Sequence, residues 1–132
     1  MSSAAGDSNN TPQNTAPQAT FMVLEIPPGM DIVACVKHFA QTNNASVNVL
    51  SGCGMLSRVA YRHPSSPHPV ILFEPLNLVS IAGRVNPAEP GYAYFTTTIT
   101  RLNGSVLGVR PFHLLAMDSV VLTVLVTSLA CT

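Results

Sequence analysis

From Phe21 onward, Met22, Leu24 and Ile26 alternate with Val23 and Glu25, which predicts a strand. The turn residues Pro27-Pro28-Gly29 follow directly and end that strand. Over residues 31–42 the apolar positions instead recur every three or four residues, which predicts one amphipathic helix. Asp31 is placed to cap its first turn, and Asn43-Asn44 supply a polar stop.

Beyond the helix, the chain consists of apolar, β-branched and aromatic runs separated by turn residues, a pattern typical of a sheet. Ser51-Gly52-Cys53-Gly54 predicts a turn between two strands, and Asn103-Gly104 predicts a two-residue hairpin turn. Residues 119–129 carry no charge, as expected of a strand covered on both faces. One helix packed on a mostly antiparallel sheet is an α+β fold. The predicted strands after the helix span residues 47–50, 56–62, 70–73, 76–85, 92–101, 105–109 and 119–129.

The first 20 residues are rich in Ser, Asn, Thr, Gln, Pro and Ala and contain almost no large apolar side chains. Such a composition cannot offset the conformational entropy that is lost on ordering. We therefore expect residues 1–20 to form a disordered polar tail. Residues 21–132 are expected to form a single domain, which suits a chain of 132 residues.

Charged residues make up only 9% of the chain, whereas hydrophobic residues make up 47%. An average soluble domain is about 25% charged, so much of the surface outside the core must be uncharged here, and such a surface favours self-association. The six basic and six acidic residues cancel. The chain therefore lacks the positive field with which a stand-alone DNA-binding domain neutralises phosphates.

The three cysteines, Cys35, Cys53 and Cys131, are odd in number and far apart, which argues against a disulfide framework or a zinc clip. The N-terminus shows neither the basic region nor the apolar run of a secretory signal. The longest apolar stretch, residues 120–130, is interrupted by hydroxyl side chains and is shorter than the ~20 residues of a spanning helix. These features predict an intracellular protein in solution, with no membrane partner.

Several short strings follow one another in an order that resembles a known family. They are Val23-Leu24-Glu25-Ile26, Asp31-Ile32-Val33, Phe39-Ala40, Val49-Leu50-Ser51-Gly52-Cys53-Gly54, Arg62-His63-Pro64-Ser65-Ser66-Pro67, Leu78-Val79-Ser80-Ile81-Ala82-Gly83 and Asn103-Gly104-Ser105-Val106-Leu107-Gly108. Through their collinear order, over about residues 22–129, the chain resembles the PPC domain, the plant and prokaryote conserved domain of the plant AT-hook motif nuclear-localised proteins.

The resemblance implies a helix packed on an antiparallel sheet, a homotrimer and a nuclear location. In the plant branch the domain follows an AT-hook, whose Arg-Gly-Arg-Pro core inserts into the minor groove of A·T-rich DNA. This sequence contains no such core. The nearest string is Gly108-Val109-Arg110-Pro111, in which Arg110 is a possible single contact to nucleic acid. Either the hooks lie outside this chain, or it resembles a hookless relative.

The resemblance also implies a partner-binding segment, since a Gly-Arg-Phe-Glu-Ile-Leu string of the family is implicated in binding other transcription factors. It aligns here with Glu74, Pro75, Leu76, Asn77, Leu78 and Val79. Three apolar positions are kept, but Pro75 and Asn77 replace the family's charged pair. Because proline has no N–H donor, Pro75 favours an edge or a bulge over a central ladder.

Some prokaryotic relatives carry a His-x-His pair and a later histidine, a set of zinc-type ligands. The corresponding positions are Tyr94, Thr96 and Arg110, so the resemblance implies no metal site in this chain. His63 and His68 flank a proline-rich loop and are interpreted as solvated side chains that lack a third ligand.

No catalytic residue and no cofactor site is predicted, and we expect the protein not to be an enzyme. Cys53 has no recognisable base to activate it and is interpreted as a small residue in a tight turn, while Cys35 is interpreted as a core residue on the helix. Four arginines of the predicted strands are interpreted as separate strand ends rather than as a DNA-binding strip. They are Arg58, Arg62, Arg84 and Arg101.

Three functions remain open from the sequence. The leading hypothesis is a non-catalytic trimerisation and protein-interaction module of an AT-hook-type transcriptional regulator, with itself, related PPC proteins and transcription factors as partners. In that hypothesis DNA is contacted only through hooks outside this chain. One alternative is a hookless subunit that modulates hook-bearing relatives in mixed trimers. The other is a small-molecule-binding PPC protein of the prokaryotic type.

Overall fold

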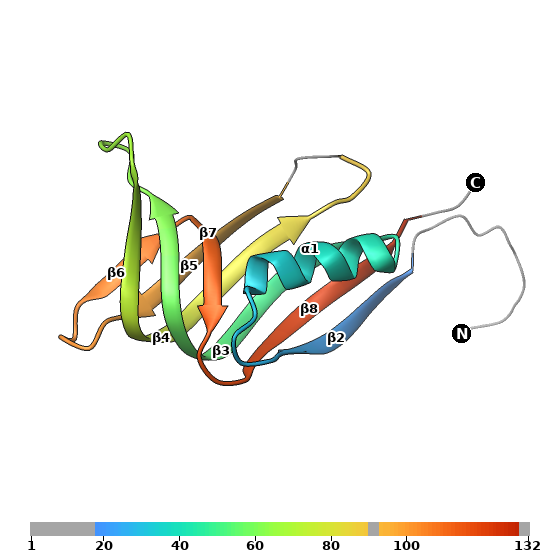
Figure 1. The fold of residues 1–132 in the computed structure, drawn as a ribbon. Helices are drawn as coiled ribbons and strands as arrows, with labels where there is room; N and C mark the ends of the chain where they lie inside the picture. The colour runs from blue at the N-terminus through green and yellow to red at the C-terminus, as the bar shows by residue number, and fades with distance from the viewer. Residues whose placement is uncertain (1–17, 90–92, 130–132) are drawn as a thin grey trace, which may run out of the picture.

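The fold is one helix laid across one face of a seven-stranded antiparallel sheet (Figure 1). The computed structural model describes residues 18–89 and 93–129, so most of the predicted tail, together with Cys131, lies outside the described residues. The predicted α+β class is confirmed. In chain order the elements are β2 (Ala19–Ile26), α1 (Ile32–Thr42), β3 (Ala45–Arg62), β4 (Pro69–Val85), β5 (Ala93–Thr100), β6 (Val106–Val109), β7 (Pro111–Ala116) and β8 (Val120–Ser128).

Strand β3 organises the sheet because it pairs with three other strands. Residues 45–53 of β3 pair with β8, and residues 56–61 pair with β7. Strand β4 runs along the opposite side of β3 over almost its whole length. The order from edge to edge is β2-β8-β3-β4-β5-β6, with β7 beside the second half of β3. The last two strands of the chain therefore complete the sheet around its central strand.

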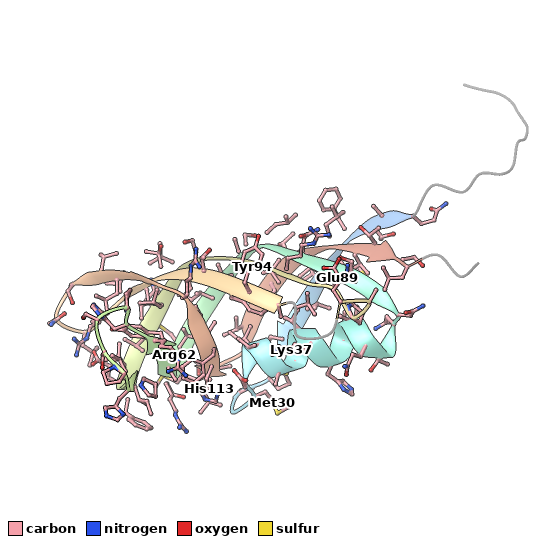
Figure 2. The ribbon with its side chains drawn as sticks, turned by 90° about the horizontal axis from the view of Figure 1, so that it is seen from above. Met30, Lys37, Arg62, Glu89, Tyr94 and His113 are labelled. Carbon is pink, nitrogen blue, oxygen red and sulfur yellow. The ribbon has the colours of Figure 1, made fainter. Side chains whose placement is uncertain are left out.

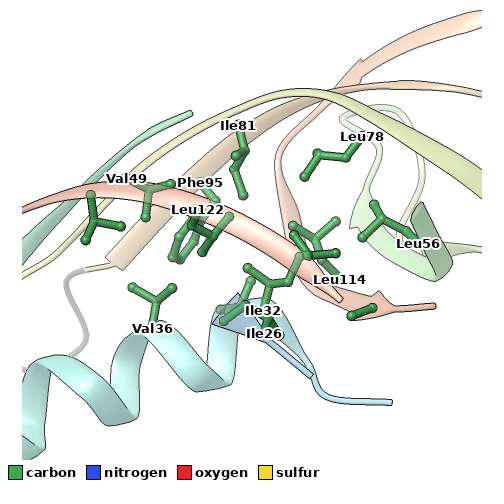
Figure 3. Close-up of a cluster of buried hydrophobic side chains, with 14 of the residues drawn as sticks. Ile26, Ile32, Val36, Val49, Leu56, Leu78, Ile81, Phe95, Leu114 and Leu122 are labelled. Carbon is green, nitrogen blue, oxygen red and sulfur yellow. The ribbon is translucent and has the colours of Figure 1, made fainter. Parts of the chain in front are cut away.

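Helix α1 buries one side against the sheet, as its apolar spacing predicts. Ile32 and Val36 are fully buried and belong to one cluster with Val49 of β3 and Leu122 of β8 (Figure 3). Phe95 of β5 joins the same cluster. The helix therefore ties together strands that are distant in sequence, and burial of these side chains from water is the main favourable term in folding.

The cap of the helix also joins it to β7. The Asp31 carboxylate accepts the backbone N–H of Ala34 at 3.3 Å, which is the predicted N-cap bond. Its other oxygen accepts the backbone N–H of Leu114 at 2.8 Å, and the His113 ring nitrogen Nδ1 lies 3.6 Å from the carboxylate. One side chain thus fixes both the start of α1 and the position of β7, a strand that the sequence pattern did not predict.

The predicted turn at residues 51–54 is wrong, because β3 continues through it. A Cβ on Gly52 would lie 2.7 Å from Leu122 Cδ2 and 2.8 Å from Ile81 Cγ2, and Gly54 has a φ of 141°. The ladders with β8 and β4 each shift register nearby, between Val49 and Ser51 and between Leu56 and Arg58. The glycines therefore permit close approach and bulges within a bent strand, rather than a reversal of the chain.

The predicted break before residue 76 is also wrong, because β4 runs without interruption through Pro75. The β5 ladder begins only at Asn77, and the β3 ladder shifts register between Leu56 and Arg58, opposite this point. Pro75 therefore lies at an irregularity where its missing N–H is tolerated.

The hairpin between β5 and β6 forms where Asn103-Gly104 predicts it, but its turn is longer than two residues. Gly104 N–H donates to the Arg101 carbonyl at 2.9 Å, and Gly104 has a φ of 87°. Asn103 does not have a positive φ, so the geometry is that of a turn closed by a left-handed glycine. The expectation for the last strand is wrong in part, since only one face of β8 is covered and Val121 is exposed.

Strands β4 and β5 approach each other closely at Gly83. A Cβ at this position would lie 2.7 Å from the Tyr94 carbonyl oxygen and closer still to the Phe95 ring. We expect Gly83→Ala to lower the free energy of unfolding by about 1–3 kcal/mol, because a buried methyl group would be forced into filled space. Urea titration followed by circular dichroism measures this change. Gly108→Ala in β6 is the matched control, since nothing lies within 4 Å of its Cβ; equal losses in the two variants would contradict the prediction.

Candidate interaction surface on the open face of the sheet

The face of the sheet opposite the helix is uncovered. Strand register places Phe21, Leu125, Asn48, Arg84 and Tyr94 in one row across β2, β8, β3, β4 and β5. Figure 2 shows Tyr94 on the opposite side of the molecule from the helix. Side chains in this row alternate along each strand with the buried ones that face α1, so the row belongs to the open face.

Large apolar side chains are exposed on this open face. Val23 is 66% exposed and Phe21 71%, which is far above what an ordinary packed strand residue shows. Among the described residues of β2 and β8, of residues 45–53 of β3 and of residues 77–85 of β4, the charged groups on this face are Glu25 and Arg84. An apolar face with so little charge is typical of an interaction surface. Its exposed large apolar residues are Phe21, Val23, Leu50, Val79, Tyr94 and Val121.

The six residues of the predicted partner-binding segment lie in β4 but do not form one surface. Leu76 and Leu78 are buried in the core at 0% and 3% exposure. Asn77 and Val79 are exposed, while Glu74 and Pro75 are half-buried. Because the segment is a strand, its side chains alternate between the two faces of the sheet. Only Asn77 and Val79 are well exposed for contact with a partner.

Glu74 is instead part of an ion pair with the end of β5. Its Oε1 lies 2.7 Å from Arg101 Nη2, and its Oε2 accepts the Leu102 backbone N–H at 3.4 Å. The hydrogen bond from Arg101 is the main cause that holds the pKa of the Glu74 carboxyl below its ordinary value. Glu74 therefore positions the β5–β6 hairpin. The sequence pattern does not predict this role, because the partner Arg101 is 27 residues away.

The four arginines predicted as separate strand ends do not form one strip. Arg101 pairs with Glu74, and the Arg58 guanidinium lies 5.0 Å from the centre of the Phe73 ring. Arg84 is exposed in β4, opposite Tyr94. Arg62, at the end of β3, and Arg110, between β6 and β7, instead line the same hollow.

The family assignment follows from a comparison with protein-family models. The model of the Plants and Prokaryotes Conserved (PCC) domain matches residues 13–129, which is most of the chain. The chain belongs to the PCC domain family. The resemblance inferred from the short strings is therefore confirmed.

Two kinds of relatives resemble this PCC domain. AT-hook motif nuclear-localized protein 20 of Arabidopsis thaliana is 32% identical over 89 residues, a match that covers 65% of this chain and 32% of that protein. The chain thus spans about a third of the length of the curated relatives that it matches. Among solved structures, a hypothetical protein of Salmonella (TM-score 0.71, 19% identity) covers 86% of this chain and 80% of its own. A PPC protein of Pyrococcus horikoshii (TM-score 0.69, 14% identity) covers 92% and 87%; both share the fold.

Four positions considered for metal or nucleophile chemistry lie in the described part of this PCC domain. Thr96 and Arg110, two of the three positions that the resemblance compares with metal ligands, line the same hollow as Arg62. The guanidinium of Arg110 repels a cation. Residues 18–89 and 93–129 contain no cluster of three metal-ligating side chains. Burial, and secondly the charge of Asp31, raise the pKa of the Cys35 thiol, which keeps it protonated. Cys53 is exposed in β3 rather than in a turn.

The loop histidines lie as expected, in exposed positions. His63 Nδ1 accepts the backbone N–H of Ser65 at 3.2 Å, and His68 is exposed nearby. Within the described ranges, no helix is long and apolar enough to cross a membrane.

The ion pair between Glu74 and Arg101 makes the stability of this PCC domain depend on pH. Because the folded-state pKa of Glu74 is lowered, the pair contributes stability above about pH 4.3, the ordinary glutamate pKa, and loses it as the pH falls through the lower folded-state value. We expect Glu74→Gln to be less stable than the parent at pH 7 and to lose less stability on acidification.

Thermal unfolding of both proteins across acidic and neutral pH measures this difference, which should be small because the pair is partly exposed. Glu25→Gln is the control, since Glu25 is exposed and forms no ion pair within the described residues. An unchanged pH dependence in Glu74→Gln would contradict the prediction.

Proposed function

We propose that this PCC domain is a non-catalytic self-assembly and partner-binding module of a nuclear transcriptional regulator that acts on A·T-rich DNA. The observation that supports it best is the open face of the sheet, which exposes six large apolar side chains and little charge. The names of the plant relatives, AT-hook motif nuclear-localized proteins, support the nuclear and DNA-related context.

The open face favours contact with a second copy of the domain over a highly charged partner. Phe21 and Val23 on the edge strand β2 and Val121 on β8 form an apolar area that continues to Leu50 on β3. Burying such surface is favourable by roughly 25 cal/mol per Å². We propose three copies in the assembly, because the family resemblance implies a homotrimer.

Partner proteins are proposed to contact the exposed side of β4, where Asn77 and Val79 are accessible. The core-facing Leu76 and Leu78 support this strand from beneath. The family's charged pair is replaced at Pro75 and Asn77, so partners of this domain are selected by apolar and amide contacts rather than by charge.

DNA binding is proposed to come from AT-hooks outside these 132 residues. The chain has a formal net charge of zero and no Arg-Gly-Arg-Pro string. Assembly would then bring several hooks together, which raises the avidity for A·T-rich DNA without new contacts.

Light scattering tests the assembly. We expect a particle of about three times 13.9 kDa at micromolar concentration, and we expect Val23→Glu to reduce that mass because a carboxylate on the apolar face resists burial. Leu102→Glu is the matched control, since Leu102 is 71% exposed but lies in the turn between β5 and β6. A stable monomer in the parent protein would refute self-assembly, and a parent-like mass for Val23→Glu would place the interface elsewhere.

The DNA prediction uses a hook added to the N-terminus. The parent chain should bind an A·T-rich duplex no better than the non-specific range of ~10⁻⁴ M at physiological salt, whereas an Arg-Gly-Arg-Pro fusion should gain A·T-selective binding. Fluorescence anisotropy at matched salt measures both, with a Ser-Gly-Ser-Pro fusion as control. Sub-micromolar, A·T-selective binding by the parent chain would show that the domain itself reads DNA.

A further inference from the structure

A hollow of about 640 Å³ lies at the corner where β6 leads into β7. It is lined by residues 61–64, at and just after the end of β3, by residues 108–110, and by residues 80–82 of β4 and 96–98 of β5. All of these residues belong to one chain.

Two arginines line this hollow, and no carboxylate lines it with them. The ladder between β3 and β7 pairs Tyr61 with Pro111, so Arg62 and Arg110 are the next two residues across from each other. Like charges on opposite positions of neighbouring strands repel. No Asp or Glu lines the hollow, and neither arginine takes part in the ion pairs that the described residues form. An anion bound between the two guanidinium groups would convert this repulsion into attraction.

Neutral hydrogen-bond donors line the same hollow. Ser80 and Thr96 are exposed on β4 and β5, and Thr98 is half-buried beside them. Their hydroxyl groups can donate to an anion. His63 Nδ1 accepts the backbone N–H of Ser65, so the neutral ring carries its proton on Nε2 and has one further donor to offer.

The size and the apolar part of the lining decide what kind of anion fits. Sites for small organic ligands typically measure ~300–1,000 Å³, and 640 Å³ is more than an inorganic anion needs. Leu50, Tyr61, Pro64 and Val109 supply apolar surface next to the two arginines. Tyr61 is half-buried and packs against the core, which gives the hollow one rigid aromatic wall.

We propose that this hollow binds a small organic phosphate, with the phosphate group between Arg62 and Arg110. The apolar body of the ligand would lie against Leu50 and Tyr61. Guanidinium groups bind phosphate through paired N–H donors, and a doubly charged phosphate matches two arginines and several hydroxyl donors better than a single carboxylate does.

Isothermal titration calorimetry of the whole chain with phenyl phosphate tests the site. We expect saturable binding of one ligand per chain that weakens as salt is added. Arg62→Gln and Arg110→Gln should each weaken it at least about tenfold, since each removes a charge-assisted bond. Arg84→Gln is the matched control, because Arg84 is an exposed arginine of β4 that does not line the hollow. Its affinity should equal that of the parent.

Further titrations identify the source of the phosphate. Inorganic phosphate should bind more weakly than phenyl phosphate, because it gains no apolar contact; equal affinity would overturn an organic ligand. A DNA duplex that binds more tightly than phenyl phosphate, with the same dependence on Arg62 and Arg110, would assign the site to a nucleic-acid backbone instead. Absence of saturation at millimolar phenyl phosphate, or equal weakening by Arg84→Gln, would also overturn the proposal.

Amide chemical shifts of the parent protein provide a measurement that needs no variant to fold. Phenyl phosphate should shift the amide signals of Thr98 and Gly108, which line the hollow, and leave those of Lys37 on the helix unchanged. Shifts spread evenly over the domain would indicate non-specific association and overturn the site.

Discussion

A sheet has two faces, and in this protein an eleven-residue helix covers only one of them. The burial of Ile32 and Val36 against Val49 and Leu122 fixes which face becomes the core. Every strand then directs alternate side chains away from that core. The apolar side chain of Phe21, on the open side, therefore stays exposed in a single chain. The proposed self-assembly and the proposed partner contacts both follow from this one-sided covering.

The length and bending of β3 add the second constraint. A strand that pairs with β8 in its first half and β7 in its second must change direction between them, and the glycines at 52 and 54 with the nearby register shifts permit this. The end of β3 then meets the corner between β6 and β7, where Arg62 and Arg110 line one hollow. Glycines in the middle of one strand therefore help to decide which side chains meet from segments nearly fifty residues apart along the chain.

The charged groups of this domain act in local pairs rather than as a field. Glu74 holds Arg101, and Asp31 joins the start of the helix to β7. Arg62 and Arg110 are different because no carboxylate lines their hollow. With so few charges in the chain, two arginines that line one hollow without a carboxylate are the feature that most favours a ligand.

The sequence by itself determined the parts that depend on local pattern. The period of the apolar residues specifies α1 and its cap Asp31, and the Asn103-Gly104 pair specifies the β5–β6 hairpin, because these structures are stabilised by neighbours in the chain. The collinear order of the short strings was also enough to identify the family. Tertiary structure decided the rest. Gly52 and Gly54 predict a turn from the sequence, but in the structure residues of β8 pack against them. Glu74 pairs with Arg101 across the sheet. Strand β7 is specified by its pairing with β3 rather than by its own residues. Contacts between distant segments depend on register and on bending, and neither leaves a periodic signal in the sequence.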